Sequence, residues 1–119
     1  MIDLPKTKYC HLDINDDWLT ISLDNDKKKN ALSATLIDEI IKVLKNAGQI
    51  TQIRGIIIKG RNRVFCSGAD LEELHQITYA KENREELTTR MSIRIGNLLQ
   101  TISNVPQITA SVVDGPCIA

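Results

Sequence analysis

Three consecutive isoleucines, Ile56, Ile57 and Ile58, constrain the fold of this chain more than any other segment. A strand with one solvated face alternates apolar and polar residues, whereas a strand without alternation is typical of a parallel sheet that helices cover on both faces. Apolar residues recur at helical spacing on either side of this run, within residues 33–48 and 87–102. Because helices that follow strands connect parallel strands, we expect an α/β fold, a mostly parallel sheet with right-handed crossover helices.

Turn and cap residues mark the ends of the first expected elements. The pair Asp16-Asp17 joins two strand-like runs, residues 9–15 and 18–23, and so predicts a β-hairpin. Ser33 is suited to cap the first helix at its N-terminus, and Gly48 is suited to end that helix.

A second helix and a last strand complete the predicted order, which is strand, strand, helix, strand, helix, strand. The helix ends before Pro106, since the residue that precedes a proline disfavours the helical conformation. Residues 107–113 form the strand that follows, and the mixed-charge run 81–86 is interpreted as a solvated helical surface. The predicted apolar stripe of the second helix consists of Leu87, Met91, Ile95, Leu98, Leu99 and Ile102.

The composition excludes several classes of partner. Fifteen lysines and arginines balance fifteen aspartates and glutamates, and aromatic residues make up 3% of the 119 residues, a length that suits one domain. Zero net charge provides no overall field for nucleic acid or an anionic membrane, and the aromatic residues are too few for a base-stacking platform. No apolar run could span a bilayer and residues 1–6 lack an apolar signal region, so we expect a cytoplasmic protein.

The cysteines and histidines argue against a metal site or a disulfide framework. Cys10, Cys66 and Cys117 are odd in number and widely spaced, and no CxxC pair occurs. We expect buried or half-buried thiols in a reducing compartment, with a reactive role left open for Cys66. His11 and His75 have no nucleophile at a recognisable spacing, so surface or structural roles are expected, and no metal is predicted.

A loop of small residues, Ser67, Gly68 and Ala69, lies between the isoleucine strand and a short acidic segment. Small side chains let a ligand approach the backbone, and a loop that enters a helix presents N–H groups in front of the positive end of the helix dipole. Such groups suit a carbonyl oxygen that becomes an oxyanion. The alternative is a tight turn in which Asp70 only caps the helix. The basic run Lys27-Lys28-Lys29 is likewise either a solvated loop or a contact for phosphates.

Three segments together resemble the crotonase family, the enoyl-CoA hydratases and isomerases. They are Asn30-Ala31-Leu32 after the basic loop, residues 64–71, and Val105-Pro106 followed by residues 110–119. The resemblance implies a crotonase-like (ClpP/crotonase) ββα superhelix, of which residues 1–119 would be the N-terminal part. By this mapping the sequence stops inside the turn that carries the second oxyanion donor.

The resemblance also implies a chemistry. In the family a CoA thioester carbonyl becomes an enolate between two backbone N–H donors, and the first donor maps onto the N–H of Ala69. The second donor and the acid–base glutamates map beyond Ala119. Coenzyme A would be part of the substrate rather than a tightly bound cofactor, and family members form trimers and hexamers. The residues implied in CoA binding are Lys28, Lys29, Ala31, Ser67, Gly68, Asp70 and Leu71.

Three functions therefore remain open on the sequence. The first is an enoyl-CoA hydratase/isomerase family enzyme that acts on acyl-CoA thioesters. The second is a truncated, catalytically inactive module that binds CoA or associates with itself. The third is a generic α/β domain with a chance resemblance.

Overall fold

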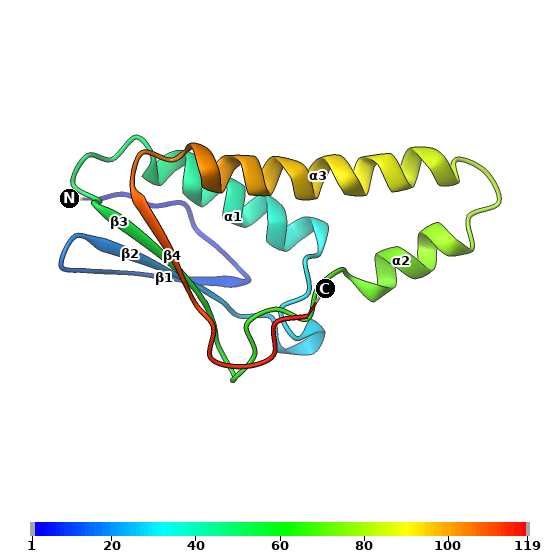
Figure 1. Cartoon of the computed structure of the whole chain (residues 1–119), viewed down its shortest axis with the longest axis horizontal. Coiled ribbons are helices and arrows are strands. Elements are labelled where there is room, and N and C mark those ends of the chain that lie inside the picture. Colours follow the sequence, from blue (N-terminus) through cyan, green and yellow to red (C-terminus); the bar gives the residue numbers. More distant parts are fainter. Residues whose placement is uncertain (1, 119) are drawn as a thin grey trace.

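The computed structural model describes residues 2–118, which form one mixed sheet with helices packed on it (Figure 1). In chain order the elements are β1 (Cys10–Asn15), β2 (Trp18–Leu23), the 3₁₀ turn η1 (Asp26–Lys28), α1 (Ala34–Ala47), β3 (Gly55–Gly60), α2 (Leu71–Thr78), α3 (Arg84–Asn104) and β4 (Ile108–Val112). The strand order is β1-β2-β3-β4, with β1 antiparallel to β2 and the other neighbours parallel. The predicted α/β fold, with a mostly parallel sheet and crossover helices, is confirmed.

The hairpin β1–β2 turns at the two aspartates that the sequence indicated. Asp16 and Asp17 have φ values of 52° and 67°, and the two strands pair from Asn15 opposite Trp18. Positive φ at both central residues is the conformation that a two-residue hairpin of the favoured twist requires, and aspartate tolerates it better than most residues. The predicted hairpin is therefore confirmed.

Helix α1 packs against the sheet, and the two form the main hydrophobic core. Its N-terminus is capped by Ser33, whose side-chain oxygen accepts a hydrogen bond from the N–H of Leu36 at 3.2 Å, as predicted. The buried residues of α1 are Leu36, Ile37, Ile40, Val43, Leu44 and Ala47, and they share one cluster with strand residues that include Leu19, Ile21 and Ile56. Burial of each large aliphatic side chain stabilises the fold by about 1.5–3 kcal/mol relative to exposure.

The helices cover only one face of the sheet within residues 2–118, so the prediction that both faces are covered is wrong for the described part of the chain. Helices α1 and α3 lie on the same side (Figure 1). Ile56 and Ile58 are 0% and 9% exposed and belong to the core cluster, whereas Ile57 is half-buried and lies outside it. Successive strand residues point to opposite faces, so the isoleucine run serves one covered and one open face.

Helix α3 begins later than the predicted helical run 81–86 and extends beyond the sheet. The helix starts at Arg84, after Asn83 in a left-handed conformation with φ 54°. Residues 81–83 are therefore a loop, and the predicted helical surface over 81–86 is wrong for these three. In the predicted stripe only Leu98 is buried, and the N-terminal half of α3 projects away from the sheet (Figure 1). Leu99, in the C-terminal half, is 61% exposed.

We predict that Gly60→Ala destabilises the fold by about 1–3 kcal/mol, measured by urea unfolding. Gly60 ends β3, and a Cβ on it would overlap the backbone carbonyl of Val64, so the backbone would have to move. The matched control is Gly96→Ala in the exposed part of α3, where a Cβ meets nothing within 4 Å. That change should raise stability by up to about 1 kcal/mol through helix propensity. Equal shifts of the two midpoints would contradict the close contact at Gly60.

Candidate functional site

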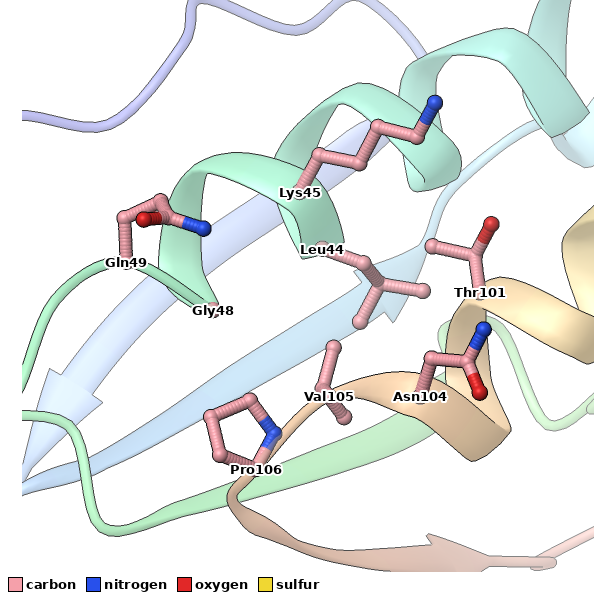
Figure 2. A pocket seen from close by; sticks show the side chains of 8 residues that line it. All are labelled: Leu44, Lys45, Gly48, Gln49, Thr101, Asn104, Val105 and Pro106. Carbon is pink, nitrogen blue, oxygen red and sulfur yellow. The ribbon is translucent and has the colours of Figure 1, made fainter.

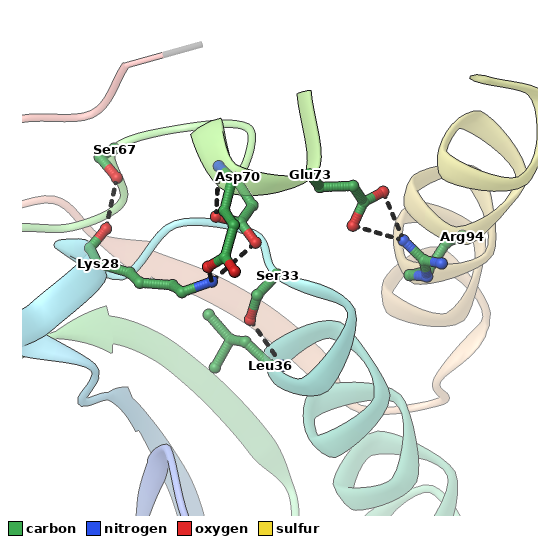
Figure 3. A network of polar contacts seen from close by, with 8 residues as sticks. Lys28, Ser33, Leu36, Ser67, Asp70, Glu73 and Arg94 are labelled. Atoms are coloured by element: carbon green, nitrogen blue, oxygen red, sulfur yellow. Dashed lines mark hydrogen bonds and ion pairs between the residues drawn. The ribbon is translucent and has the colours of Figure 1, made fainter. Parts of the chain in front are cut away.

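Two segments that are far apart in sequence run side by side and form the base of the site. The N–H of Ser67 donates to the carbonyl of Lys29 at 3.1 Å, and the N–H of Leu32 donates to the carbonyl of Gly68 at 2.7 Å. The Ser67 hydroxyl donates to the carbonyl of Lys28 at 3.0 Å (Figure 3). Leu32 and Ala69 are partners in a short parallel bridge. Hydrogen bonds to backbone carbonyls thus hold the basic loop and the small-residue loop together.

The buried side chain of Asn30 connects the segments that precede these two loops through hydrogen bonds. The side chain is 2% exposed, its Oδ1 accepts the N–H of Asn25 at 2.8 Å, and its Nδ2 donates to the carbonyls of Val64 at 3.1 Å and Phe65 at 3.3 Å. Its φ of 58° is a conformation that asparagine accepts more readily than most residues. Sequence reasoning quoted Asn30 as part of a motif but assigned it no role. An asparagine at the end of a charged loop was the one available signal.

An open cavity of about 720 Å³ lies above the paired loops. Most of the residues predicted for the site line it together, namely Lys28, Lys29, Ala31, Ser67, Ala69, Asp70 and Leu71. Gly68 is buried beneath the lining, where its N–H donates to the Cys66 sulfur at 3.3 Å. With φ 98°, Gly68 adopts a conformation that favours glycine, and this turns the chain toward the cavity.

Ala69 lines this cavity, and its backbone N–H has no acceptor in the described residues 2–118. Helix α2 begins two residues later, at Leu71, with Asp70 as its N-cap, so Ala69 lies outside the helical hydrogen bonds. The residue is half-buried, and the positive end of the α2 dipole lies directly behind it. Such an N–H can donate to an oxygen atom that enters the cavity, and it interacts most strongly with one that carries negative charge.

Asp70 links the basic loop to the start of α2 (Figure 3). Its Oδ1 accepts the N–H of Glu72 at 3.3 Å, which confirms the predicted cap. Its Oδ2 lies 2.9 Å from the Lys28 ammonium, and Glu72 contacts the same ammonium at 3.2 Å. The hydrogen bonds that the ammonium donates, above all to Asp70 and then to Glu72, raise the pKa of Lys28 above the usual lysine value. Sequence reasoning missed this pair because its members lie on separate loops.

A second ion pair holds α2 against α3. Arg94 donates to both carboxylate oxygens of Glu73, at 2.9 and 3.1 Å, and the two side chains are 22% and 19% exposed (Figure 3). Both bonds come from Nη1 of the guanidinium, and charged hydrogen bonds of this kind are stronger than neutral ones. Because no residue of α2 is buried, this contact has a large share in placing the helix.

A smaller cavity of about 340 Å³ lies elsewhere, between the C-terminal ends of α1 and α3 (Figure 2). Its lining includes Leu44, Val105 and Pro106, and Lys45 is its one ionisable residue. A single amine without a partner group offers no acid–base or nucleophilic chemistry, so we place the candidate site at the larger cavity.

The remaining residues considered from the sequence lie outside the site. His11 and His75 are exposed, on β1 and α2. Cys10 and Cys66 are buried as predicted, but Cys117 is exposed, so the prediction for that thiol is wrong. It follows the turn after β4 and no helix covers it within residues 2–118. Over the same range, no three metal-binding side chains gather, and no helix combines the length and apolar character needed to cross a bilayer.

The sheet, its crossover helices and the loop at the base of α2 define a crotonase fold, as the comparisons with known proteins show. A solved enoyl-CoA hydratase from Bacillus halodurans matches 91% of this chain with a TM-score of 0.77 and 27% identity, and 43% of that structure is covered. Residues 13–119 match the family described as enoyl-CoA hydratase/isomerase. The chain belongs to this family.

The names of curated proteins similar to this chain state different reactions. Carboxymethylproline synthase from Pectobacterium carotovorum is 29% identical over 102 residues, 85% of this chain and 39% of the relative. Ethylmalonyl-CoA decarboxylase from mouse is 26% identical over 95 residues, 80% of this chain and 28% of the relative. The chain therefore spans less than half the length of the curated relatives it matches, and the names do not agree on one reaction.

We predict that Arg94→Ala speeds amide hydrogen exchange across α2 about tenfold. Loss of charged hydrogen bonds costs about 1.5 kcal/mol or more, and about 1.4 kcal/mol corresponds to a factor of ten in an opening equilibrium. Arg90→Ala is the matched control, because Arg90 contacts Glu86 one turn away on α3, with both side chains over 60% exposed. Exchange in α2 that responds equally to the two changes would contradict the anchoring role of Arg94.

The Lys28 contacts predict a pH-dependent contribution to stability. The folded-state pKa is raised, so this contribution is complete below the ordinary lysine pKa of 10.5 and is lost as the pH rises through the higher folded-state pKa. Lys28→Met should therefore lower the urea midpoint at pH 7, and its difference from the unmodified chain should shrink above pH 10.5. Lys29→Met is the control, since its contact with Asp26 is exposed and should have little effect. A difference that stays constant into the alkaline range would show that the Lys28 charge is irrelevant.

Proposed function

We propose that the chain binds acyl-CoA thioesters and that the N–H of Ala69 donates to the thioester carbonyl as negative charge develops on it. The observation that carries this proposal is that Ala69 lines the 720 Å³ cavity while its N–H has no acceptor within residues 2–118. A fixed donor aimed at an oxygen that becomes an enolate stabilises the charged state more than the ground state. Family membership supports a CoA thioester as the source of that carbonyl.

The charged lining supports a CoA grip in the same place. Lys27, Lys28 and Lys29 all line the cavity, as do Leu71 and Leu74 of α2. Ammonium groups suit phosphates as point charges, while the exposed leucines offer apolar contact for an acyl or pantetheine chain. Because Lys28 already contacts Asp70 and Glu72, we assign the first phosphate contacts to Lys29, whose side chain is 60% exposed. The backbone at Ala31 and Ser67 would border the adenine.

The described residues would supply one donor and no acid–base pair. The lining carboxylates are Asp70 and Glu72, and both contact Lys28. Under the proposal, the second oxyanion donor and the proton-transfer groups would come from other polypeptide segments. Hydration and double-bond isomerisation remain equal candidates for the overall reaction.

A second candidate is a CoA-binding or self-associating module without turnover, and the last strand favours it. All five residues of β4 are exposed, and Ile108 is 68% exposed and Val112 45% exposed. Strand β4 pairs with β3 on one side and ends the sheet of the described residues on the other. Such an edge is a template for another chain, including a second copy of this one in a homo-oligomer.

We predict that acetyl-CoA binds more tightly than S-ethyl-CoA, a thioether that lacks the carbonyl, by about two- to tenfold in calorimetric titration. This ratio corresponds to the net worth of about one hydrogen bond. Ala69→Pro, which removes the N–H, should abolish the difference, whereas Ala69→Gly, which keeps it, should retain the difference.

The outcomes separate the two candidates. A flat titration with acetyl-CoA at millimolar concentration contradicts CoA binding in either form. Equal affinity for the two ligands in the unmodified chain contradicts the Ala69 donor and favours the module. Loss of crotonyl-CoA absorbance tests turnover with the same variants, and turnover that Ala69→Pro lowers by roughly 10²–10³-fold supports the enolate route.

A further inference from the structure

We propose that Cys66 and Cys117 form a reversible disulfide that cross-links two strands beside the cavity in response to peroxide. Nothing in the proposed acyl-CoA chemistry uses either thiol, so this inference stands whether or not that function holds. The argument rests on how the backbone places the two residues opposite each other.

A parallel bridge places the two cysteines face to face. The N–H of Cys66 donates to the carbonyl of Pro116 at 3.2 Å, and the N–H of Ile118 donates to the carbonyl of Cys66 at 2.9 Å. These two bonds flank Cys117 and make it the partner of Cys66. Neighbouring strands lie about 4.8 Å apart, within the 4.4–6.8 Å between Cα atoms that a disulfide spans, and bridge partners project on the same side.

Packing around the bridge keeps this register. Gly115 passes so close to Arg63 that a Cβ on the glycine would overlap the arginine carbonyl. The N–H of Phe65 adds a further bond to the carbonyl of Pro116 at 3.0 Å. A slip of one residue would break these contacts, so Cys117 stays opposite Cys66.

The two thiols differ in the way that a sensing pair requires. Cys117 is exposed, so peroxide can reach it, whereas Cys66 is 7% exposed. Burial is the main cause that raises the pKa of Cys66; the hydrogen bond from the Gly68 N–H lowers this pKa, and the neighbouring Cys117 raises it. Cys66 therefore stays protonated while Cys117 reacts first.

The chemistry balances with peroxide as the oxidant. The Cys117 thiolate attacks one peroxide oxygen, the O–O bond breaks, and a sulfenic acid and one water form. The Cys66 sulfur then attacks the Cys117 sulfur, the S–O bond breaks, and the departing hydroxide takes the Cys66 proton as a second water. Two thiols thus lose two electrons and two protons, and one peroxide is reduced to two waters. A dithiol such as dithiothreitol reverses the bond by exchange.

The disulfide would act on the cavity directly. Cys66 accepts the N–H of Gly68, and Ala69 follows it in the lining, while Ile118 lines the cavity from the other strand. A covalent link between the two strands would hold these walls at one separation.

The test is peptide mapping of the intact chain after treatment with hydrogen peroxide, followed by alkylation of free thiols under denaturing conditions. Trypsin places the three cysteines in separate peptides, residues 9–27, 64–81 and 95–119. We expect peptides 64–81 and 95–119 to be linked, with the intact mass lowered by two hydrogens, and dithiothreitol to separate them. Cys10 serves as an internal control, because burial, aided by Glu39, raises its pKa to about 12, and peptide 9–27 should remain alkylated.

Variants make the outcome decisive. Cys117→Ser changes an exposed residue and should abolish the link without unfolding the chain, whereas Cys10→Ser should retain the link. In Cys66→Ala, the Cys117 sulfenic acid should persist and be captured by dimedone, while the unmodified chain gives little adduct. Peptides that stay unlinked, or a link between two copies of peptide 95–119 on a non-reducing gel, would overturn the proposal.

Discussion

The pairing of the basic loop with the small-residue loop is the interaction on which the rest of the site depends. Two backbone hydrogen bonds, from Ser67 to Lys29 and from Leu32 to Gly68, join segments that the whole of α1 and β3 separate in sequence. Without them, the lysines and Ala69 would lie on independent loops. The buried amide of Asn30 adds bonds to the same two segments, so the site is built on polar backbone geometry at the end of a parallel sheet. Ligand sites commonly occupy this end of open α/β sheets.

Charge then couples the paired loops to the helices. Asp70 belongs to the small-residue loop, caps α2 and contacts Lys28, so a single carboxylate connects three parts of the structure. Because Asp70 is 7% exposed, its contact with Lys28 is less screened by solvent than the contacts made by Lys29. A phosphate that approaches Lys28 meets an ammonium already shared between two carboxylates. The same arrangement that orders the basic loop therefore opposes strong anion binding at that one lysine.

Much of the fold could be predicted from the sequence, because local signals and tertiary structure agree along most of the chain. The two aspartates predicted the hairpin, Ser33 the first helix and the isoleucine run a parallel strand. The run could not show that only one face would be covered, since that depends on what packs against it. Leu99 fits the helical spacing but is 61% exposed, and residues 81–83 are polar enough for either a helix or a loop. The predicted site residues lie together at one cavity because they belong to the two loops that follow β2 and β3 at the same end of the sheet. The Lys28 pair and the role of Asn30 could not be predicted, since both depend on contacts between distant loops.

Because α2 is weakly attached, the parts of the chain that line the cavity differ in stiffness. One wall consists of the paired loops, which hydrogen bonds tie to the sheet, and it can yield only if those bonds break. Another part of the lining comes from α2, which buries no side chain and connects to α3 mainly through Glu73 and Arg94. Displacing this helix outward exposes little apolar surface and so costs little free energy. The site thus combines a rigid floor that sets where a reacting group lies with a compliant side that adjusts to the bulk of the attached chain.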